Sequence, residues 1–239
     1  DKSLEAFINI PIGSNIAARL SMYDVKDGGW IDNKEATYSY QNARGYTIDN
    51  TTAPYDVAKD DYNDSRKEGS RLRISADIND VNIDLSFLTQ ESYYNGSYET
   101  DVLTDDQSAA MPPRSNTRFS KERYDDEFEQ ISATISGSIN DDIDFVLNTS
   151  IFERDTAYTY DYASYVEYYY YAAYAYYVCN LYEYYGYYYA DVNDCRDPRM
   201  TYAQSNDIDR KSTELRLQSN YDNGFNWVLG AFQESNEKI

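Results

Sequence analysis

The chain contains no histidine among its 239 residues. Ser-His-Asp and Cys-His catalysis, imidazole metal ligation and histidine acid–base steps are therefore excluded within these residues. The sequence also has no phosphate-binding glycine loop and no Cys-x-x-Cys pair, and its carboxylate clusters lack EF-hand spacing. We expect a protein that is not an enzyme, with no catalytic residue, no metal site and no cofactor.

Positive charge is also scarce. The 21 Lys and Arg residues face 42 Asp and Glu residues, so the formal net charge is -21. Because nucleic acids are bound through clustered Lys and Arg, we expect no nucleic-acid partner. Acidic loops on an outer surface explain the excess better than a dedicated cation site does.

Long hydrophobic runs are missing as well. The mean hydropathy is -0.79, and no run approaches the roughly 20 apolar residues of a membrane-spanning helix. Hydropathy alone would class the chain as soluble. Strands of a membrane barrel, however, present only every second residue to lipid and give a weak signal of this kind. A barrel is therefore compatible with this hydropathy.

What the chain does have is strict alternation of apolar and polar residues. In the first such stretch Leu4, Ala6, Ile8 and Ile10 fall on one face, and Glu5 and Asn9 fall on the other together with Phe7. A period of two is the side-chain period of a β-strand with one apolar and one polar side. The alternation predicts eight strands, near residues 3–12, 15–27, 67–78, 81–93, 119–139, 143–156, 208–221 and 225–234.

The connections between these stretches alternate short and long. Turn residues fill the short ones, which are Gly13-Ser14, Asn79-Asp80, 140–142 and 222–224. The long ones, roughly 28–66, 95–118 and 157–207, all leave the same end of the strands. This pattern predicts an all-β transmembrane antiparallel barrel with short periplasmic turns and long extracellular loops. A soluble sandwich has no reason to segregate its loops in this way.

We expect residues 1–239 to form one partial barrel domain. The start at Asp1 shows no signal peptide, and the end at Ile239 lacks the terminal aromatic residue of a bacterial outer-membrane barrel. Both features suggest a piece of a longer chain.

The two faces of these strands carry different expectations. The apolar face is predicted to contact outer-membrane lipid through Leu72, Ile74, Leu85, Ile135, Leu147 and Leu217. The polar face is predicted to line a lumen or contact a plug through Arg19, Arg71, Arg73, Glu214 and Arg216. The alternative is a sandwich in which these charges simply face water.

The last long connection is rich in tyrosine: 17 of the 29 tyrosines lie between Tyr158 and Tyr189. Tyrosine offers a large rigid contact area with a polar tip, so the loop is a candidate ligand-stacking surface. Self-packing of a long loop explains it equally well, and a third interpretation is that the stretch differs from the gene-encoded sequence. The candidate ligand-binding residues are Trp30, Tyr165, Tyr168, Tyr169, Tyr182 and Tyr184.

Two cysteines, Cys179 and Cys195, lie in the same loop. In an oxidising compartment we expect a disulfide between them, worth about 3 kcal/mol in the chain-entropy model. The alternative is a pair of free thiols in a reducing compartment.

Two segments carry a resemblance to a known family. One runs from Glu5 to Gly13 (EAFINIPIG) and is followed by Ala18-Arg19-Leu20-Ser21 and Gly28-Gly29-Trp30-Ile31-Asp32-Asn33. The other is STELRLQS at 212–219, followed by FNWVLG at 225–230. Together they resemble the early barrel and a mid-barrel hairpin of the TonB-dependent outer-membrane receptors.

The resemblance implies a barrel of about 22 strands, filled by the protein's own plug domain and coupled to the TonB complex through an N-terminal region. Neither plug nor TonB box is in this chain. The implied function is active uptake of a scarce small-molecule or oligosaccharide ligand across the bacterial outer membrane. Ferric siderophores, cobalamin and oligosaccharides all remain open. The alternatives are a passive or structural outer-membrane barrel, such as a porin or adhesin, and a soluble carbohydrate-binding β-protein.

Overall fold

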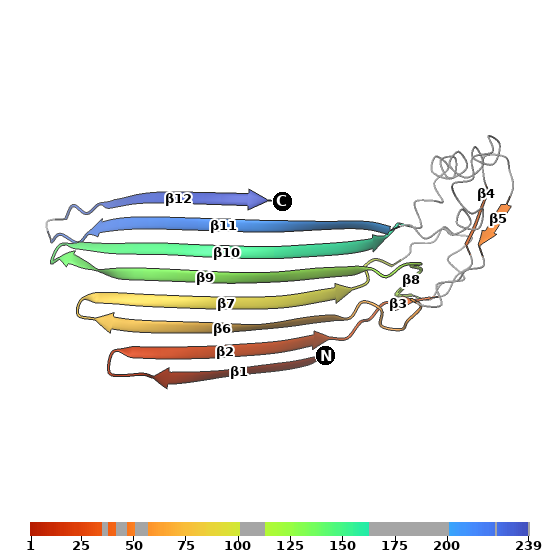
Figure 1. Ribbon diagram of the computed structural model, residues 1–239, viewed down its shortest axis with the longest axis horizontal. Helices are drawn as coiled ribbons and strands as arrows, with labels where there is room; N and C mark the ends of the chain where they lie inside the picture. Colours follow the sequence, from red (N-terminus) through yellow and green to blue (C-terminus); the bar gives the residue numbers. More distant parts are fainter. Residues whose placement is uncertain are drawn as a thin grey trace.

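The computed structural model describes residues 1–34, 38–41, 47–50, 57–100, 113–162, 201–222 and 224–238. Its main element is one antiparallel sheet of eight strands, ordered β1-β2-β6-β7-β9-β10-β11-β12 (Figure 1). The strands are β1 (Lys2–Pro11), β2 (Ile16–Asp27), β6 (Ser65–Ile78), β7 (Val81–Asn95), β9 (Arg123–Asn140), β10 (Ile143–Asp161), β11 (Thr201–Ser219) and β12 (Val228–Lys238).

The all-β prediction and the eight antiparallel strands are confirmed, and each strand pairs with its neighbour in the sheet's chain order. The sheet is open: β1 and β12 lie at its two edges, and no closed barrel is formed by the described residues (Figure 1). Within the same part of the chain, no helix is long and apolar enough to cross a membrane.

Three strands start three or more residues from the predicted position, and β10 and β12 end later than predicted, at Asp161 and Lys238. β9 begins at Arg123 rather than near 119, because the amides of Phe119 and Ser120 bond the Asp161 carboxylate. β11 begins at Thr201 rather than 208, because ladder pairing with β10 continues through residues that do not alternate in hydrophobicity. β12 begins at Val228 rather than 225, because Asn226 accepts a bond from the Tyr221 amide within the turn.

The short turns have the chemistry that their residues predict. Asn79 adopts a positive φ of 52° and, with Asp80, joins paired Ile78 and Val81 in a two-residue hairpin. At the next turn the Asn140 side chain accepts a bond from the Asp142 amide at 2.9 Å. The three long connections all leave the sheet at its opposite end (Figure 1).

Four short strands inside the long connections were not predicted. β3 (Asp32–Asn33) pairs in parallel with β8 (Ser115–Asn116), and β4 (Tyr38–Gln41) pairs antiparallel with β5 (Thr47–Asn50). The β3–β8 pair ties the first long connection to the second, so these two loops are one structural unit.

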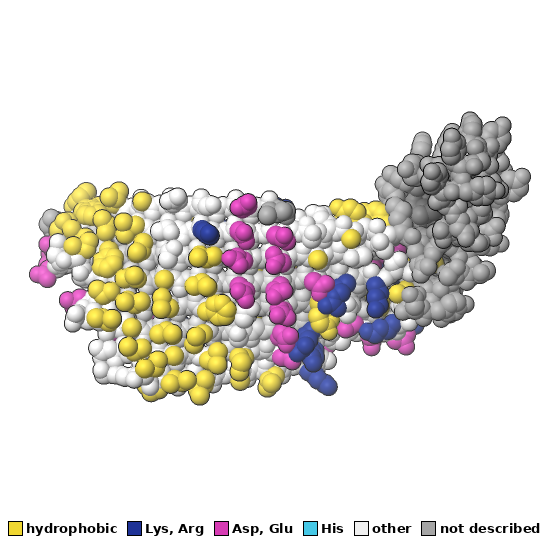
Figure 2. All heavy atoms as spheres, in the orientation of Figure 1, with side chains coloured by type: hydrophobic (Ala, Val, Ile, Leu, Met, Phe, Trp, Pro, Cys, Tyr) yellow, Lys and Arg dark blue, Asp and Glu magenta, His cyan; other side chains and the backbone are white. Residues whose placement is uncertain are grey.

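Strand register aligns the apolar side chains into rows that cross the sheet, since directly paired residues project from the same face. One row crosses six strands and consists of Ile8, Leu20, Leu72, Phe87, Ile131 and Ile151. A second row consists of Ile16, Ala76, Ile83, Ile135, Leu147, Leu215 and Ala231. We call this side the apolar face and the other the polar face. Figure 2 shows the apolar face, with its hydrophobic side chains gathered toward the turn end.

Acidic side chains form two further rows on the apolar face, nearer the loops (Figure 2). The first row is Glu129, Glu153, Asp209 and Glu237. The second is Asp24, Glu68, Glu91, Glu127, Asp155 and Asp207. We call them the acidic double row. It marks a sharp limit to the apolar part of this face.

No second layer covers the sheet in the described residues. Large apolar side chains on the apolar face stay open to solvent, with Leu85 45% and Ile131 55% exposed. The hydrophobic side chains that are buried lie in the long connections, and they are Ile31, Val57, Tyr62 and Phe119. The packed core of the described chain is thus at the loop end, outside the sheet.

Candidate functional site

The polar-face residues predicted from the sequence do share one face. Register places Arg19, Arg71, Arg73, Glu214 and Arg216 on the side opposite the apolar rows. Two of the arginines form ion pairs, Arg73 with Asp84 at 2.9 Å and Arg216 with Glu214 at 2.6 Å, and Arg71 donates to the Ser86 hydroxyl at 3.1 Å. Arg19 lies over the Phe7 ring, 4.3 Å from its centroid.

At the loop end of the same face, tyrosines from four strands are in contact. We call this group the tyrosine ladder, and its members are Tyr94, Tyr124, Tyr158, Tyr160, Tyr162 and Tyr202. Ring centroids of successive pairs are 5.0 to 6.5 Å apart. Pairing of Tyr94, Tyr124 and Tyr158 across β7, β9 and β10 brings these rings together. The ladder is an aromatic surface that crosses the sheet.

Hydroxyl groups of the ladder converge on one amide. Tyr158 and Tyr202 both donate to the Gln204 side-chain oxygen, the latter at 2.9 Å. The Gln204 nitrogen in turn donates to the Asn206 side chain at 3.0 Å. These bonds hold the rings of β10 and β11 in fixed positions relative to each other.

Beside the ladder, residues of the first two long connections pack into what we call the loop core, which comprises residues 28–34, 57–64 and 113–122. Asn33 is 1% exposed and is central to it. Its side-chain nitrogen donates to the Val57 and Arg118 carbonyls, each at 3.0 Å, and its oxygen accepts from the Arg118 amide at 2.7 Å. One side chain thus links three segments of backbone.

A glycine is required where two of these segments touch. A Cβ at Gly29 would lie 2.2 Å from the Asp61 carbonyl oxygen, and Asp61 itself has a positive φ of 52°. The amides of Trp30 and Ile31 then both donate to the Asn63 side chain, at 2.7 and 2.8 Å. The Gly-Gly-Trp-Ile-Asp-Asn motif at 28–33 therefore has a structural role in building the loop core.

Two buried ionisable groups also lie in the loop core. The Tyr62 hydroxyl accepts from the Glu122 amide at 2.9 Å and donates to the Ser120 carbonyl at 3.3 Å. Burial raises the pKa of Tyr62 to about 12. Burial also raises the pKa of the Glu122 carboxyl, against the opposing effect of Arg118.

The elevated pKa of Tyr62 predicts an alkaline weakness of the loop core. Unfolded tyrosine ionises near pH 10, whereas Tyr62 keeps its proton to about pH 12, so stability is present below pH 10 and is lost as the pH rises from 10 to 12. We expect subtilisin cleavage within 57–64 and 113–122, mapped by mass spectrometry, to increase over this range. In Tyr62→Phe the increase should be smaller, because the group whose ionisation favours the unfolded loop has been removed. An equal increase in both proteins would contradict the assignment.

The loop core and the ladder meet at a hollow of about 390 Å³. It is lined by Ser97, Glu99, Arg118, Glu122, Tyr160, Asp161 and Tyr162. Arg118 and Glu122 form an ion pair at 3.5 Å with side chains only 12% and 4% exposed. The hollow thus combines ladder rings with a buried charge pair, and it is our candidate ligand site.

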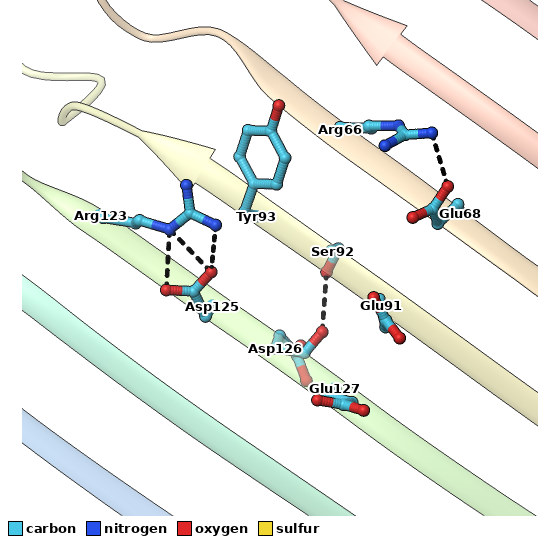
Figure 3. Close-up of a pocket in the computed structure, with 9 residues that line it drawn as sticks. All are labelled: Arg66, Glu68, Glu91, Ser92, Tyr93, Arg123, Asp125, Asp126 and Glu127. Carbon is cyan, nitrogen blue, oxygen red and sulfur yellow. Dashed lines mark hydrogen bonds and ion pairs between the residues drawn. The ribbon is translucent and has the colours of Figure 1, made fainter.

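A second hollow, of about 120 Å³, opens on the apolar face just beyond the acidic double row. Figure 3 shows Arg66 and Arg123 turned toward carboxylates there rather than toward the open space. Arg66 contacts Glu68 and Arg123 contacts Asp125, each at 2.6 Å, and Arg123 also lies 4.4 Å from the Tyr93 ring centroid. We interpret this hollow as salt-bridged surface, since its cations are already neutralised.

Of the ligand-binding residues predicted from the sequence, Trp30 lies at the loop core with its side chain 48% exposed. The others, Tyr165, Tyr168, Tyr169, Tyr182 and Tyr184, lie outside the described residues, as do Cys179 and Cys195. In the described part of the chain, no three acidic, histidine or cysteine side chains are placed to hold a metal ion.

Sequence reasoning missed the ladder and the loop core. Tyr158, Tyr160 and Tyr162 alternate in the sequence, which is a signal for one strand face, but they were grouped with the tyrosine-rich loop. Tyr94, Tyr124 and Tyr202 are isolated in sequence and become neighbours through strand pairing.

No protein-family model matches the chain, and no curated protein matches it.

Proposed function

We propose that this chain is a segment of an outer-membrane β-barrel that takes up a scarce ligand by TonB-dependent active transport. The observation that carries the proposal is the apolar face: several rows of apolar side chains that each cross most strands of the sheet and are open to solvent in the described chain. Soluble proteins rarely leave so large an apolar surface uncovered. A lipid bilayer is a partner that would cover all of it.

The dimensions of the apolar face suit a bilayer. The apolar face has four apolar rows, two residues apart along each strand. The first is the row of Ile78 and Val81, and the last is the row of Leu72 and Phe87. At about 6.7 Å for each two residues, the outermost rows are about 20 Å apart. The apolar band of outer-membrane barrels is about 25 Å tall, which leaves room for the turn-end residues as well.

The acidic double row supports the same placement. A charged side chain on a lipid-facing strand position is costly at the centre of the bilayer and nearly free at its surface. Rows of directly opposed carboxylates such as Glu127 and Asp155 therefore belong outside the hydrocarbon, at the level of the outer headgroups. The loop end then faces the cell exterior, and the short turns face the periplasm.

Unpaired edges support a larger barrel. β1 and β12 each leave one side without a strand partner in the described chain, and an exposed edge of 10 or 11 residues invites pairing. In the proposed assembly further strands pair with both edges and close a barrel of about 22 strands. The arginines of the polar face, Arg19, Arg71 and Arg73, then face the interior and its plug.

Cells expressing the protein, with and without a working TonB complex, provide the test. The probes are a ferric tris-catecholate, cobalamin and maltohexaose, each radiolabelled, and the measurement is accumulation against the concentration gradient. We expect TonB-dependent accumulation of one probe. Equal entry of a probe in both strains would instead support a passive barrel, and recovery of the protein from cells without detergent would support a soluble binding protein.

A further inference from the structure

The tyrosine ladder has a geometry that points to a class of ligand. We propose that it is a binding platform for a neutral oligosaccharide, whose successive sugar rings lie across β9, β10 and β11. The inference deepens the proposed function by naming its substrate class, and it rests on that function only for the step of uptake.

Several rings of the tyrosine ladder are partly exposed to solvent and can therefore contact a ligand. Tyr160, Tyr162 and Tyr202 are 41%, 38% and 45% exposed although each contacts another ring. A tyrosine ring is rigid and amphipathic, so ordering it on binding costs little conformational entropy. Rings that stay partly open on a polar sheet face can stack against the C–H faces of pyranose rings.

The spacing of the ladder follows the strands. Neighbouring strands lie about 4.8 Å apart, and ring centroids on neighbouring strands are 5.9 Å (Tyr158–Tyr202) to 6.5 Å (Tyr124–Tyr158) apart. A row of contacts at this repeat suits a ligand that is itself a chain of rings with apolar C–H faces. A single compact ligand would use one or two of these rings and leave the others without a role.

Polar groups beside the rings match the edges of a sugar. The Gln204 and Asn206 amides and the Tyr158 and Tyr202 hydroxyls form one connected network, and such groups can both donate and accept. Farther from the loops on the same face, Asp126 lies one row and Arg154 two rows from the row of Tyr124 and Tyr158, and the two side chains are joined by two bonds at 2.7 and 2.8 Å. Sugar hydroxyls need alternating donors and acceptors, which this surface provides.

Charge disfavours anionic ligands. The hollow that adjoins the ladder contains Glu99, Glu122 and Asp161 with Arg118, and Arg118 is within 3.7 Å of Glu99 and 3.5 Å of Glu122. With a formal net charge of -21, the protein repels anionic ligands. An anionic ferric chelate or a phosphorylated sugar is disfavoured, whereas a neutral oligosaccharide is not.

The test is calorimetric binding of maltohexaose, cellohexaose and xylohexaose to the intact chain in detergent, with a ferric tris-catecholate and cobalamin as competing classes. We expect at least one hexasaccharide to bind. The double variant Tyr158→Ala/Tyr202→Ala should weaken that binding at least tenfold. Tyr93→Ala is the matched control, because Tyr93 lies at the same end of the sheet on the opposite face, and it should leave binding unchanged.

Tyr160→Ala is a second variant in case the double variant fails to fold. The Tyr160 ring belongs to the ladder and is 41% exposed, but its hydroxyl is not part of the hydrogen-bond network at Gln204, so its loss should disturb the fold less. It should weaken binding at least threefold. Absence of binding to all three hexasaccharides, or binding that neither ladder variant changes, would overturn the proposal and leave the tyrosines a packing role.

The outcome is separable from that of the proposed function. Hexasaccharide binding that depends on the ladder, with entry into cells that does not depend on TonB, would refute active transport and keep the platform. TonB-dependent accumulation of the ferric chelate or cobalamin, without ladder-dependent sugar binding, would support active transport and refute the oligosaccharide platform.

Discussion

Replacing Ile135 by arginine is expected to destabilise the protein in a phospholipid bilayer by about 2–4 kcal/mol. Ile135 lies on the apolar face between Ile83 and Leu147, in one of the central apolar rows. An arginine there must either bring its charge into hydrocarbon or distort the bilayer around it. The measurement is the free energy of unfolding in guanidinium chloride for the protein reconstituted in vesicles.

Thr134→Arg is the matched control, one residue away on the same strand. Thr134 projects from the polar face opposite Asp84 and Asn148, so its replacement adds a cation next to a carboxylate in hydrated surroundings. We expect a change of less than about 1 kcal/mol, the usual range of an exposed ion pair. Equal destabilisation by the two arginines would show that β9 does not have one lipid-facing side.

Asn33→Leu is expected to open the loop core at a cost of about 3 kcal/mol or more. The change keeps the side chain's size and removes its three hydrogen bonds, leaving the Arg118 amide and the Val57 and Arg118 carbonyls without this partner. Each buried backbone group left unsatisfied costs about 1–3 kcal/mol. Hydrogen exchange of the peptide containing the Arg118 amide should speed up by about a hundredfold or more, the kinetic equivalent of that energy.

Asn15→Leu makes the same chemical change in an exposed turn at the other end of the sheet and should leave exchange in the loop core unaltered. Exchange in β9 and β10 should also stay slow in Asn33→Leu, because the strand ladders do not depend on Asn33. Unchanged protection of Arg118 in Asn33→Leu would mean that the loops are held by other contacts, and that the loop core does not depend on this side chain.

The sequence predicted the elements that form through interactions between residues close together in the chain. It did not predict those that depend on residues far apart. The strands were predictable because alternation is a local property, and the hairpin at Asn79-Asp80 because two residues decide its backbone conformation. The starts of β9 and β11 were not, because the Asp161 carboxylate and the pairing of Tyr160 with Tyr202 extend or end them from a distance in the chain.

The candidate site divides in the same way. The sequence predicted one face for Arg19, Arg71, Arg73, Glu214 and Arg216, and register confirms that they share it. It did not predict the hollow, which forms where the loop core meets the ladder. Asn33 appeared only as the last residue of a motif, since its partners are 24 and 85 residues away.

By itself, the sequence determined the β-class, the number of long strands, the end from which the long loops leave, and which side of each strand is apolar. All of these follow from residue order, since side chains alternate across a strand. The tertiary structure alone decided which residues lie beside one another: the acidic double row, the tyrosine ladder and the open edges at β1 and β12. The physical reason is strand register, because pairing between distant segments turns scattered residues into continuous rows.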